Sequence, residues 1–162
     1  RFPFYGVVQY GGVRLELRRL KVRFGPRRGS DALTVVGGAK LLQSLALDPA
    51  SVAVTASVGV PAGEHMAVVE RTLPVGALRA NRAHTSFRFA DRHGTQAGGL
   101  RSLVVTLRHG RLDVRLAAAG LDLSALRVAV PEYTVAFEIG DTTVGVTRGF
   151  RKNRKGTIVQ GP

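Results

Sequence analysis

Four histidines are the residues best suited to hold a metal or to move a proton: His65, His84, His93 and His109. A hydrolytic metal site needs two ligands at helical or strand spacing together with a carboxylate. Glu64 and His65 come closest to that pattern, but adjacent residues of a strand point to opposite faces. His93 and His109 each precede a glycine at an expected loop tip, where a solvated histidine is the ordinary case. The sequence therefore predicts no metal site and no cofactor.

Patterns for nucleophilic or acid–base catalysis are also missing. The chain has no Gly-x-Ser-x-Gly elbow, and Gly29-Ser30-Asp31 is typical of a turn, because Ser and Asp side chains bind nearby backbone there. Glu132 and Glu138 on one strand would lie about 20 Å apart, too far for a glycosidase pair. Gly37-Gly38 and Gly98-Gly99 lack the spacing of a phosphate loop and predict strand turns or bulges. We therefore expect no catalytic residue and no enzymatic activity.

The composition narrows the class of protein further. The chain has 162 residues, enough to bury roughly 70% of its unfolded surface without a cross-link. It has no cysteine, which excludes disulfides, thiolate metal sites and covalently attached haem. No apolar run approaches the ~20 residues of a membrane-spanning helix. Because the sequence starts at Arg1 without a leader pattern, we expect either a mature exported protein whose signal peptide is gone or a fragment of a longer chain.

Positive charge is the strongest anomaly. Lysine and arginine total 24 against 11 acidic residues, a formal net charge of +13. A solvated face that protects edge strands would explain part of this, and a GC-rich genome also raises arginine content. However, an imbalance of this size repels itself unless an anion is near. The charge gathers in residues 14–28 and 148–155, and the residues expected to bind an anionic polymer are Arg18, Lys21, Arg23, Arg148, Arg151, Lys152, Arg154 and Lys155.

Several anionic partners would satisfy this charge. Proteins that bind single-stranded nucleic acid place aromatic side chains among the basic ones so that bases can stack. Here each basic cluster has one aromatic residue, Phe24 or Phe150, and the alternation of its strand turns Phe24 inward. Nucleic acid is therefore less favoured than acidic polysaccharide, lipopolysaccharide or an acidic partner protein.

The N-terminal segment is the second anomaly. Residues 1–10 hold four of the ten aromatic residues, and a free tail of this kind would expose costly apolar surface. Phe2, Phe4, Val8 and Tyr10 have even spacing, which suits a strand that fills pockets on a neighbouring sheet. These four residues are the expected subunit interface, in a head-to-tail contact that grows into a filament. The alternative is that the segment docks on its own domain as a first strand or a cap of the core.

Short stretches of alternating apolar and polar residues predict strands with one buried face. The phase slips by one residue at Arg18-Arg19, which predicts a β-bulge in the strand of residues 13–24. Arg108–Arg111 predicts a tight hairpin with Gly110 at positive φ, and Asp122 could cap one short helical turn at residues 121–126. The other expected strands cover residues 32–36, 39–45, 52–58, 66–73, 85–89, 103–107, 112–116, 133–139, 143–147 and 157–160.

This number of short strands predicts an all-β fold, a Greek-key-like β-sandwich. We expect residues 1–12 to be an extension and residues 13–162 to be the sandwich domain. Residues 23–29 echo residues 88–94, and residues 47–59 echo residues 121–140, which indicates an internal duplication of 20–84 and 85–160. Chance matching in a biased composition is the other explanation. A duplication would mean two similar β-halves packed together.

The order of these motifs resembles secreted bacterial β-sandwich repeat modules of surface and extracellular proteins. The matching pieces are Asp31–Gly37, Asp48-Pro49, Val54–Gly59 and Ile139–Asp141. The resemblance implies a fold class and an extracellular or cell-surface location, and it carries over no site residue. On this basis the expected function is a structural module that assembles with copies of itself as a homo-oligomer or filament. The alternative function is a binding module for an anionic polymer.

Overall fold

The structure of the chain is a computed structural model, which describes residues 13–41, 47–60, 66–126, 132–149, 151–152 and 158–159. It is almost entirely made of β-strands, arranged as two mostly antiparallel sheets. The elements are β1 (Val13–Arg14), β2 (Glu16–Arg23), β3 (Asp31–Lys40), β4 (Val54–Val60), β5 (Met66–Leu73), β6 (Arg79–Ala80), β7 (Ser86–Ala90), β8 (Leu100–Arg108), β9 (Arg111–Leu121), the short 3₁₀ helix η1 (Ser124–Leu126), β10 (Glu132–Ile139), β11 (Thr142–Gly149), β12 (Arg151–Lys152) and β13 (Ile158–Val159).

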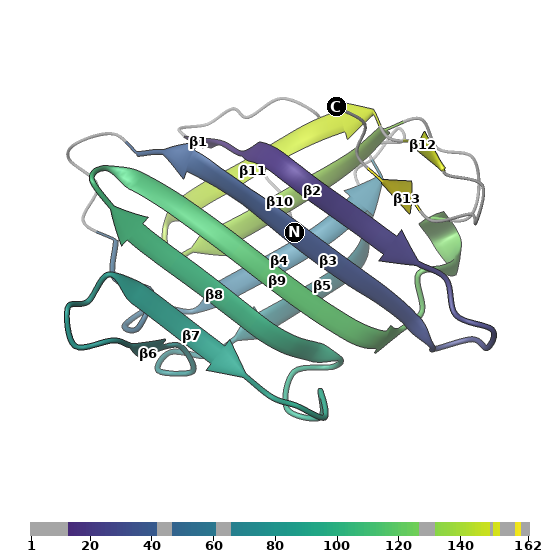
Figure 1. Cartoon of the computed structure of the whole chain (residues 1–162), viewed down its shortest axis with the longest axis horizontal. Helices are drawn as coiled ribbons and strands as arrows, with labels where there is room; N and C mark the ends of the chain where they lie inside the picture. Colours follow the sequence, from purple (N-terminus) through teal and green to yellow (C-terminus); the bar gives the residue numbers. More distant parts are fainter. Residues whose placement is uncertain are drawn as a thin grey trace.

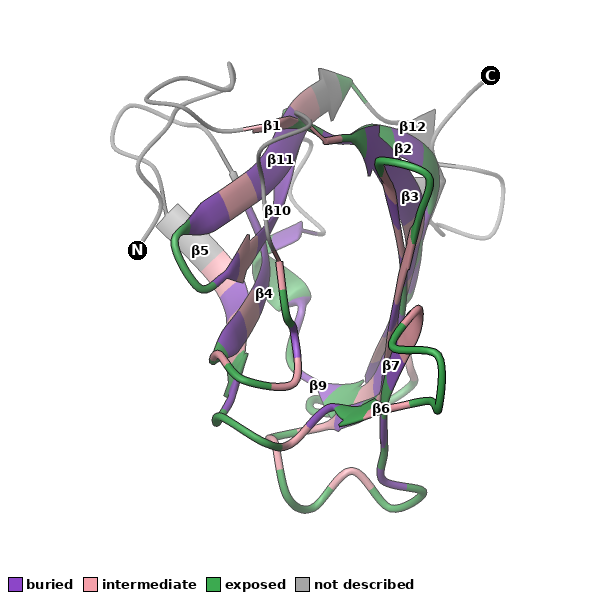
Figure 2. Cartoon of the chain, turned by 90° about the vertical axis from the view of Figure 1, so that its left-hand side faces the viewer, coloured by how far each residue is buried: buried purple, intermediate pink, exposed green. Residues whose placement is uncertain are grey.

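The two sheets pack face to face, as Figures 1 and 2 show. The five-stranded sheet has the order β1-β11-β10-β4-β5, and the eight-stranded sheet has the order β12-β13-β2-β3-β9-β8-β7-β6. The core lies between them, and Tyr133, Phe87 and Phe137 are its largest fully buried side chains. The predicted all-β sandwich is therefore confirmed. Within the described residues no helix is long and apolar enough to cross a membrane.

Burial follows the predicted alternation of residue types. In β2 the apolar residues Leu17, Leu20 and Val22 are buried, and the basic residues are exposed. The register of β2 against β3 shifts between Leu17 and Arg19, which confirms the predicted bulge and makes Arg18 the extra residue.

Two predicted turns are also present. Arg108 pairs with Arg111, and both residues between them have positive φ, 50° at His109 and 71° at Gly110. This is the geometry that suits the twist of a two-residue hairpin. In η1 the backbone N–H of Ser124 donates to Asp122 Oδ1 over 3.1 Å, so Asp122 caps the one short turn as expected.

The glycine pairs have different roles. Gly98 and Gly99 have φ of 55° and 98° in the turn before β8, as predicted. Gly37 and Gly38 do not make a turn: residues 32–36 and 39–40 belong to one unbroken strand, β3, and the prediction of two strands is wrong there. Crowding explains these glycines, because a Cβ on Gly38 would lie 2.5 Å from Oδ1 of Asp113. Residues 42–45 of the second predicted strand lie outside the described residues.

One side of the sandwich is joined by continuous chain. β1 runs parallel to β11 in the five-stranded sheet, and the Leu15 N–H extends this pairing by donating to Gly145 O over 3.0 Å. The chain then enters β2 of the eight-stranded sheet at Glu16. Leu15 itself is fully buried, so this crossing is anchored in the core.

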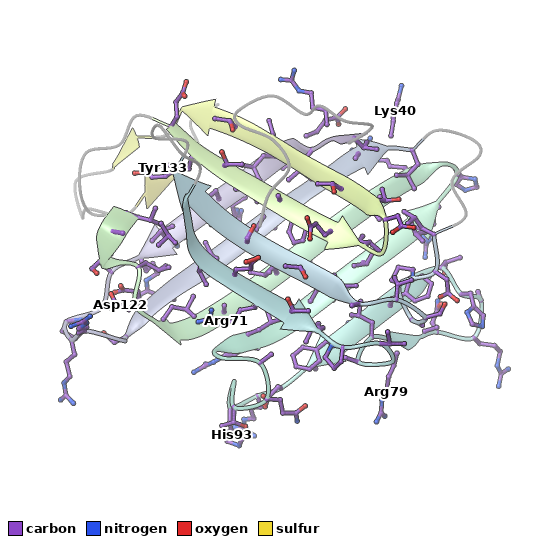
Figure 3. All side chains as sticks on the ribbon, turned by 180° about the vertical axis from the view of Figure 1, so that it is seen from behind. Lys40, Arg71, Arg79, His93, Asp122 and Tyr133 are labelled. Atoms are coloured by element: carbon purple, nitrogen blue, oxygen red, sulfur yellow. The ribbon has the colours of Figure 1, made fainter. Side chains whose placement is uncertain are left out.

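On the opposite side residues 74–78 join β5 to β6, the edge strands of the two sheets, and a side chain adds a further contact. β5 is the edge strand there, and Arg71 shares the core-facing side of the sheet with its register partner Ala56. Its Nε donates to Gly98 O over 2.7 Å and its Nη1 donates to Glu70 O over 2.8 Å. Figure 3 shows Arg71 at this edge. The charge on the inner face of an edge strand also discourages pairing with another chain.

The sheet order repeats a pattern within the chain. The hairpin β2-β3 is followed by the hairpin β4-β5 in the other sheet, and β8-β9 is followed by β10-β11 in the same way. β3 lies beside β9 and β4 lies beside β10, so the two sets meet at the middle of each sheet. The echo of residues 23–29 in residues 88–94 falls on the ends of β2 and β7, which this pattern does not pair. The duplication of 20–84 and 85–160 stays a prediction.

Candidate anion-binding surface

The basic residues predicted to bind a polymer come from both ends of the chain, and the eight-stranded sheet brings their strands together. Arg18, Lys21 and Arg23 are exposed on β2. β13 pairs with β2, and β12, which consists of Arg151 and Lys152, pairs with β13. The two basic segments therefore share one end of one sheet. Arg148 lies on β11 of the other sheet, and Arg154 and Lys155 lie outside the described residues.

The bulge in β2 increases the charge on the outer face of this sheet. Without it, Arg18 and Arg19 would point to opposite faces. With it, both are exposed, Arg18 reaches Asp113 on β9, and Arg19 pairs with Val36 on β3. The two consecutive arginines therefore lie on the solvent side.

Arg19 is the first residue of a row that crosses the sheet. The register places Arg19 beside Val36, and Val36 beside Arg115 of β9. Arg115 pairs with Val104 of β8, and Val104 pairs with Arg88 of β7. Arg88 in turn pairs with Arg79 of β6. We call these six residues the arginine row. Its cations occur on every second strand from β2 to β7, and the last two arginines face each other directly.

The four arginines of the row are exposed, and none has an acidic partner among the described residues. Figure 3 shows Arg79 projecting away from the body of the protein. Val36 and Val104 between the cations are half-buried. Like charges that face each other across neighbouring strands destabilise a sheet. Arg79 and Arg88 therefore form a place where a bound anion would remove a repulsion.

A second group of charges lies beside the row and neutralises itself. Arg18 donates from Nη2 to Oδ1 of Asp113 over 2.6 Å, and Nε of Arg111 lies 3.5 Å from the same oxygen. Nη2 of Arg111 also lies 3.2 Å from Oε2 of Glu16. These four residues surround Gly38, whose register partners are Glu16 and Asp113. Because Asp113 is paired twice, it does not cancel the charge of the neighbouring row.

The outer face is hollowed at two points along the row. A depression of about 400 Å³ lies over the middle strands and is lined by Arg18, Val36, Val104, Thr106, Asp113, Val114 and Arg115. Another, of about 500 Å³, lies at the β6–β7 edge and is lined by Gly76, Ala77, Arg79, Arg88, Phe89, Ala90 and Gln96. Both contain arginines of the row, and both are open to solvent.

The space between the sheets is not a ligand site of comparable size. Its cavity measures about 20 Å³, little more than the ~10–15 Å³ that one water needs. Apolar residues of both sheets line it, and Arg71 stands among them.

The described histidines and carboxylates do not form a metal centre. Among the described residues no group of three His, Asp or Glu side chains could hold a metal ion. His93 lies in the loop before β8 and His109 at the hairpin tip, while His84 lies in the turn before β7 at 6.4 Å from the Phe87 ring. His65 lies outside the described residues. The subunit-interface prediction for Phe2, Phe4, Val8 and Tyr10 also falls outside them and stays a prediction.

Sequence reasoning missed most of the arginine row. Arg79, Arg88 and Arg115 are isolated in the sequence, so no cluster marks them. The alternation of β9, in which Val114 and Leu116 are buried, already predicts that Arg115 points outward. What the sequence lacks is the register that places these arginines beside each other.

Comparisons with known proteins add no relative: no protein-family profile, curated protein or solved structure matches this chain significantly. The case for function therefore depends on the outer face of the eight-stranded sheet.

Proposed function

We propose that the protein is a binding module for an anionic polymer, which it holds on the outer face of the eight-stranded sheet. The observation that carries this proposal is the arginine row, with four exposed cations in one register line and no acidic partner in the described part of the chain. Guanidinium groups bind carboxylate and sulfate oxygens through two parallel hydrogen bonds, which favours arginine for such a surface.

The dimensions of the row favour a polymer over a small ligand. It crosses five strand intervals, from β2 to β6, or about 24 Å at ~4.8 Å per interval. The depressions along it are open, whereas sites for small molecules enclose most of the ligand surface. A chain that contacts several arginines at once gains effective concentration after the first contact.

Acidic polysaccharide is favoured over nucleic acid. The aromatic residues of the strands that form the row, Phe87 and Phe89, are buried in the core. The described residues of this face therefore offer no ring on which a base could stack. A ligand of this class agrees with the extracellular or cell-surface location that the sequence predicts.

Heparin chromatography with matched variants tests the proposal. We expect the double variant Arg88→Gln/Arg115→Gln to elute at clearly lower salt than the parent, because each substitution removes one contact of the row. The control Arg14→Gln/Arg27→Gln removes the same charge from two exposed arginines elsewhere, on β1 and in the β2–β3 loop. An equal shift for both pairs would mean that net charge alone retains the protein, and the proposal would be wrong.

The C-terminal basic segment gives a second arm of this test. Changing Arg151, Lys152, Arg154 and Lys155 together to Gln should leave the circular dichroism spectrum intact and weaken heparin retention. Unchanged retention across the salt gradient would exclude this segment from the binding surface.

A further inference from the structure

The arginine row has a period as well as a charge. Neighbouring strands lie ~4.7–4.9 Å apart, so a cation on every second strand gives a repeat of about 9.6 Å along Arg19, Arg115 and Arg88. Val36 and Val104 occupy the positions between them. The line therefore alternates charged and apolar contacts at the spacing of the strands.

The rows on either side carry hydroxyl groups. One contains Gly38, Asp113 and Thr106, and the other contains Thr34, Ala117 and Ser102. Ala117 keeps the second row low, the space over Gly38 in the first row is occupied by the ion pairs of Asp113 with Arg18 and Arg111, and the threonines and Ser102 can donate and accept hydrogen bonds. The hydroxyl groups beside the arginine row can therefore form hydrogen bonds with the hydroxyl groups of an extended sugar chain.

On the basis of the function proposed above, we infer that the row binds an extended polysaccharide in which an acidic sugar alternates with a neutral one. In such a chain each ring advances by about the distance between two neighbouring strands. A carboxylate then meets an arginine on every second strand, and the neutral ring between two carboxylates lies over Val36 or Val104. The polymer runs across the strands from β2 to β7, and Arg79 on β6 lies beyond the alternating part of the row.

Other anionic polymers fit this period less well. A polysaccharide with a carboxylate on every ring would place alternate carboxylates over the valines, where they lose water without gaining a cation. A strand of duplex DNA carries a phosphate every ~3.4 Å, so most of its phosphates would fall between the arginines. The pattern of charges, rather than their number, is therefore expected to decide which polymer binds.

Isothermal titration calorimetry with two sets of oligosaccharides, matched in their number of charges, tests this inference on the full chain. The probes are hyaluronan oligosaccharides, with one carboxylate per two sugars, and oligogalacturonates of the same number of carboxylates, with one on every sugar. At fixed ionic strength we expect the parent protein to bind hyaluronan oligosaccharides about fivefold more tightly than oligogalacturonates. The expected difference is small because each exposed arginine–carboxylate contact adds little to the binding free energy.

The double variant Val36→Arg/Val104→Arg makes the test sharper. It places a cation on every strand of the row and should reverse the preference in favour of oligogalacturonate, while circular dichroism confirms the fold. Arg115→Gln, which removes the middle cation and adds none between the others, should weaken the binding of both probes.

Each outcome separates the two proposals. Equal affinity for both probes, or tighter binding of oligogalacturonate by the parent, would overturn the inference about alternating sugars and leave the anionic-polymer function standing. Tighter binding of duplex DNA than of either probe would also overturn it. If neither the probes nor heparin bound, the proposed function would fail as well.

Discussion

Asp113 on β9 lies opposite Gly38 on β3, and the missing side chain at position 38 lets two arginines from different strands reach the same carboxylate. Arg18 approaches from β2 and Arg111 from β9 itself, so the contact links three neighbouring strands at the bulge. A glycine in a strand interior lowers strand stability when nothing needs the space. Here the space is occupied by an ion-pair network, which also fixes the outer face beside the arginine row.

Gly38→Ala should therefore destabilise the protein. The added Cβ would lie 2.5 Å from Oδ1 of Asp113, 2.9 Å from Nη2 of Arg111 and 3.0 Å from the carbonyl oxygen of Leu112. The last of these is backbone and cannot move aside. We expect a loss of about 1–3 kcal/mol in the free energy of unfolding, measured by denaturant titration.

Val36→Ala is the matched control for this prediction. It removes atoms from the same face of the same strand without creating a clash, and should cost less than about 1 kcal/mol. If Gly38→Ala unfolded at the same denaturant concentration as the parent, the crowding explanation for Gly38 would be wrong.

Residue types alone predict which side chains of this fold face solvent, because alternation has a strict period of two. The bulge at Arg18, the hairpin at His109-Gly110 and the turn capped by Asp122 were readable for the same reason: each depends on neighbours in the chain. Gly37-Gly38 was misread because local rules treat a glycine pair as a turn. The reason for Gly38 is Asp113, which lies far away in the sequence.

The candidate site was predictable in composition and not in geometry. The basic cluster on β2 is visible as a run, but Arg88 and Arg115 join it only through the register of β3, β9, β8 and β7. Register depends on long-range pairing that one sequence does not specify.

A second prediction concerns Asp31, a buried carboxylate that joins two loops. Its Oδ1 accepts the N–H of Gly25, and its Oδ2 accepts the N–H of Leu123, both over 2.8 Å. Asp31→Ala removes the carboxylate that accepts these two N–H groups, one buried and one partly buried, and losing such an acceptor costs about 1–3 kcal/mol. We expect a loss of about 2–4 kcal/mol in denaturant unfolding. Asp141→Ala, an exposed aspartate in the β10–β11 turn, is the control and should change stability by less than about 0.5 kcal/mol.

The third prediction is a dependence of stability on acid pH that comes from Asp122. Hydrogen bonds from Ser124 and Arg28 lower the pKa of its carboxyl from 3.8 to about 2. A lowered pKa in the folded state means that the charged form stabilises the fold. This contribution is present above pH 3.8 and is lost as the pH falls toward 2.

Thermal unfolding of the parent and of Asp122→Asn across this range measures the effect. The variant should melt at a lower temperature than the parent at neutral pH, and the two melting curves should converge as the pH approaches 2. A difference that stayed constant down to that pH would show that the charge of Asp122 is not responsible.

The last prediction concerns Arg71, which connects the edge of the five-stranded sheet to the loop before β8. Its Nε donates to Gly98 O, and a Cβ on Gly98 would lie only 2.5 Å from that nitrogen, so the loop fits closely against the guanidinium. Two hydrogen bonds close the same loop: the Gln96 N–H donates to Asp91 Oδ2, and the Gly99 N–H donates to Gly94 O.

Arg71→Met keeps an apolar stem beside the cavity and removes the guanidinium donors, so the loop should open more often. Losing about 1 kcal/mol here corresponds to roughly fivefold faster exchange of the Gln96 and Gly99 amide hydrogens, with the Val135 amide of β10 unchanged. Arg92→Met, in the same loop but exposed and with no side-chain hydrogen bond to any described residue, is the control. Equal exchange in the two variants would show that the Arg71 contact does not hold the loop, whereas faster exchange in Arg71→Met alone would identify it as the contact that holds the loop against β5.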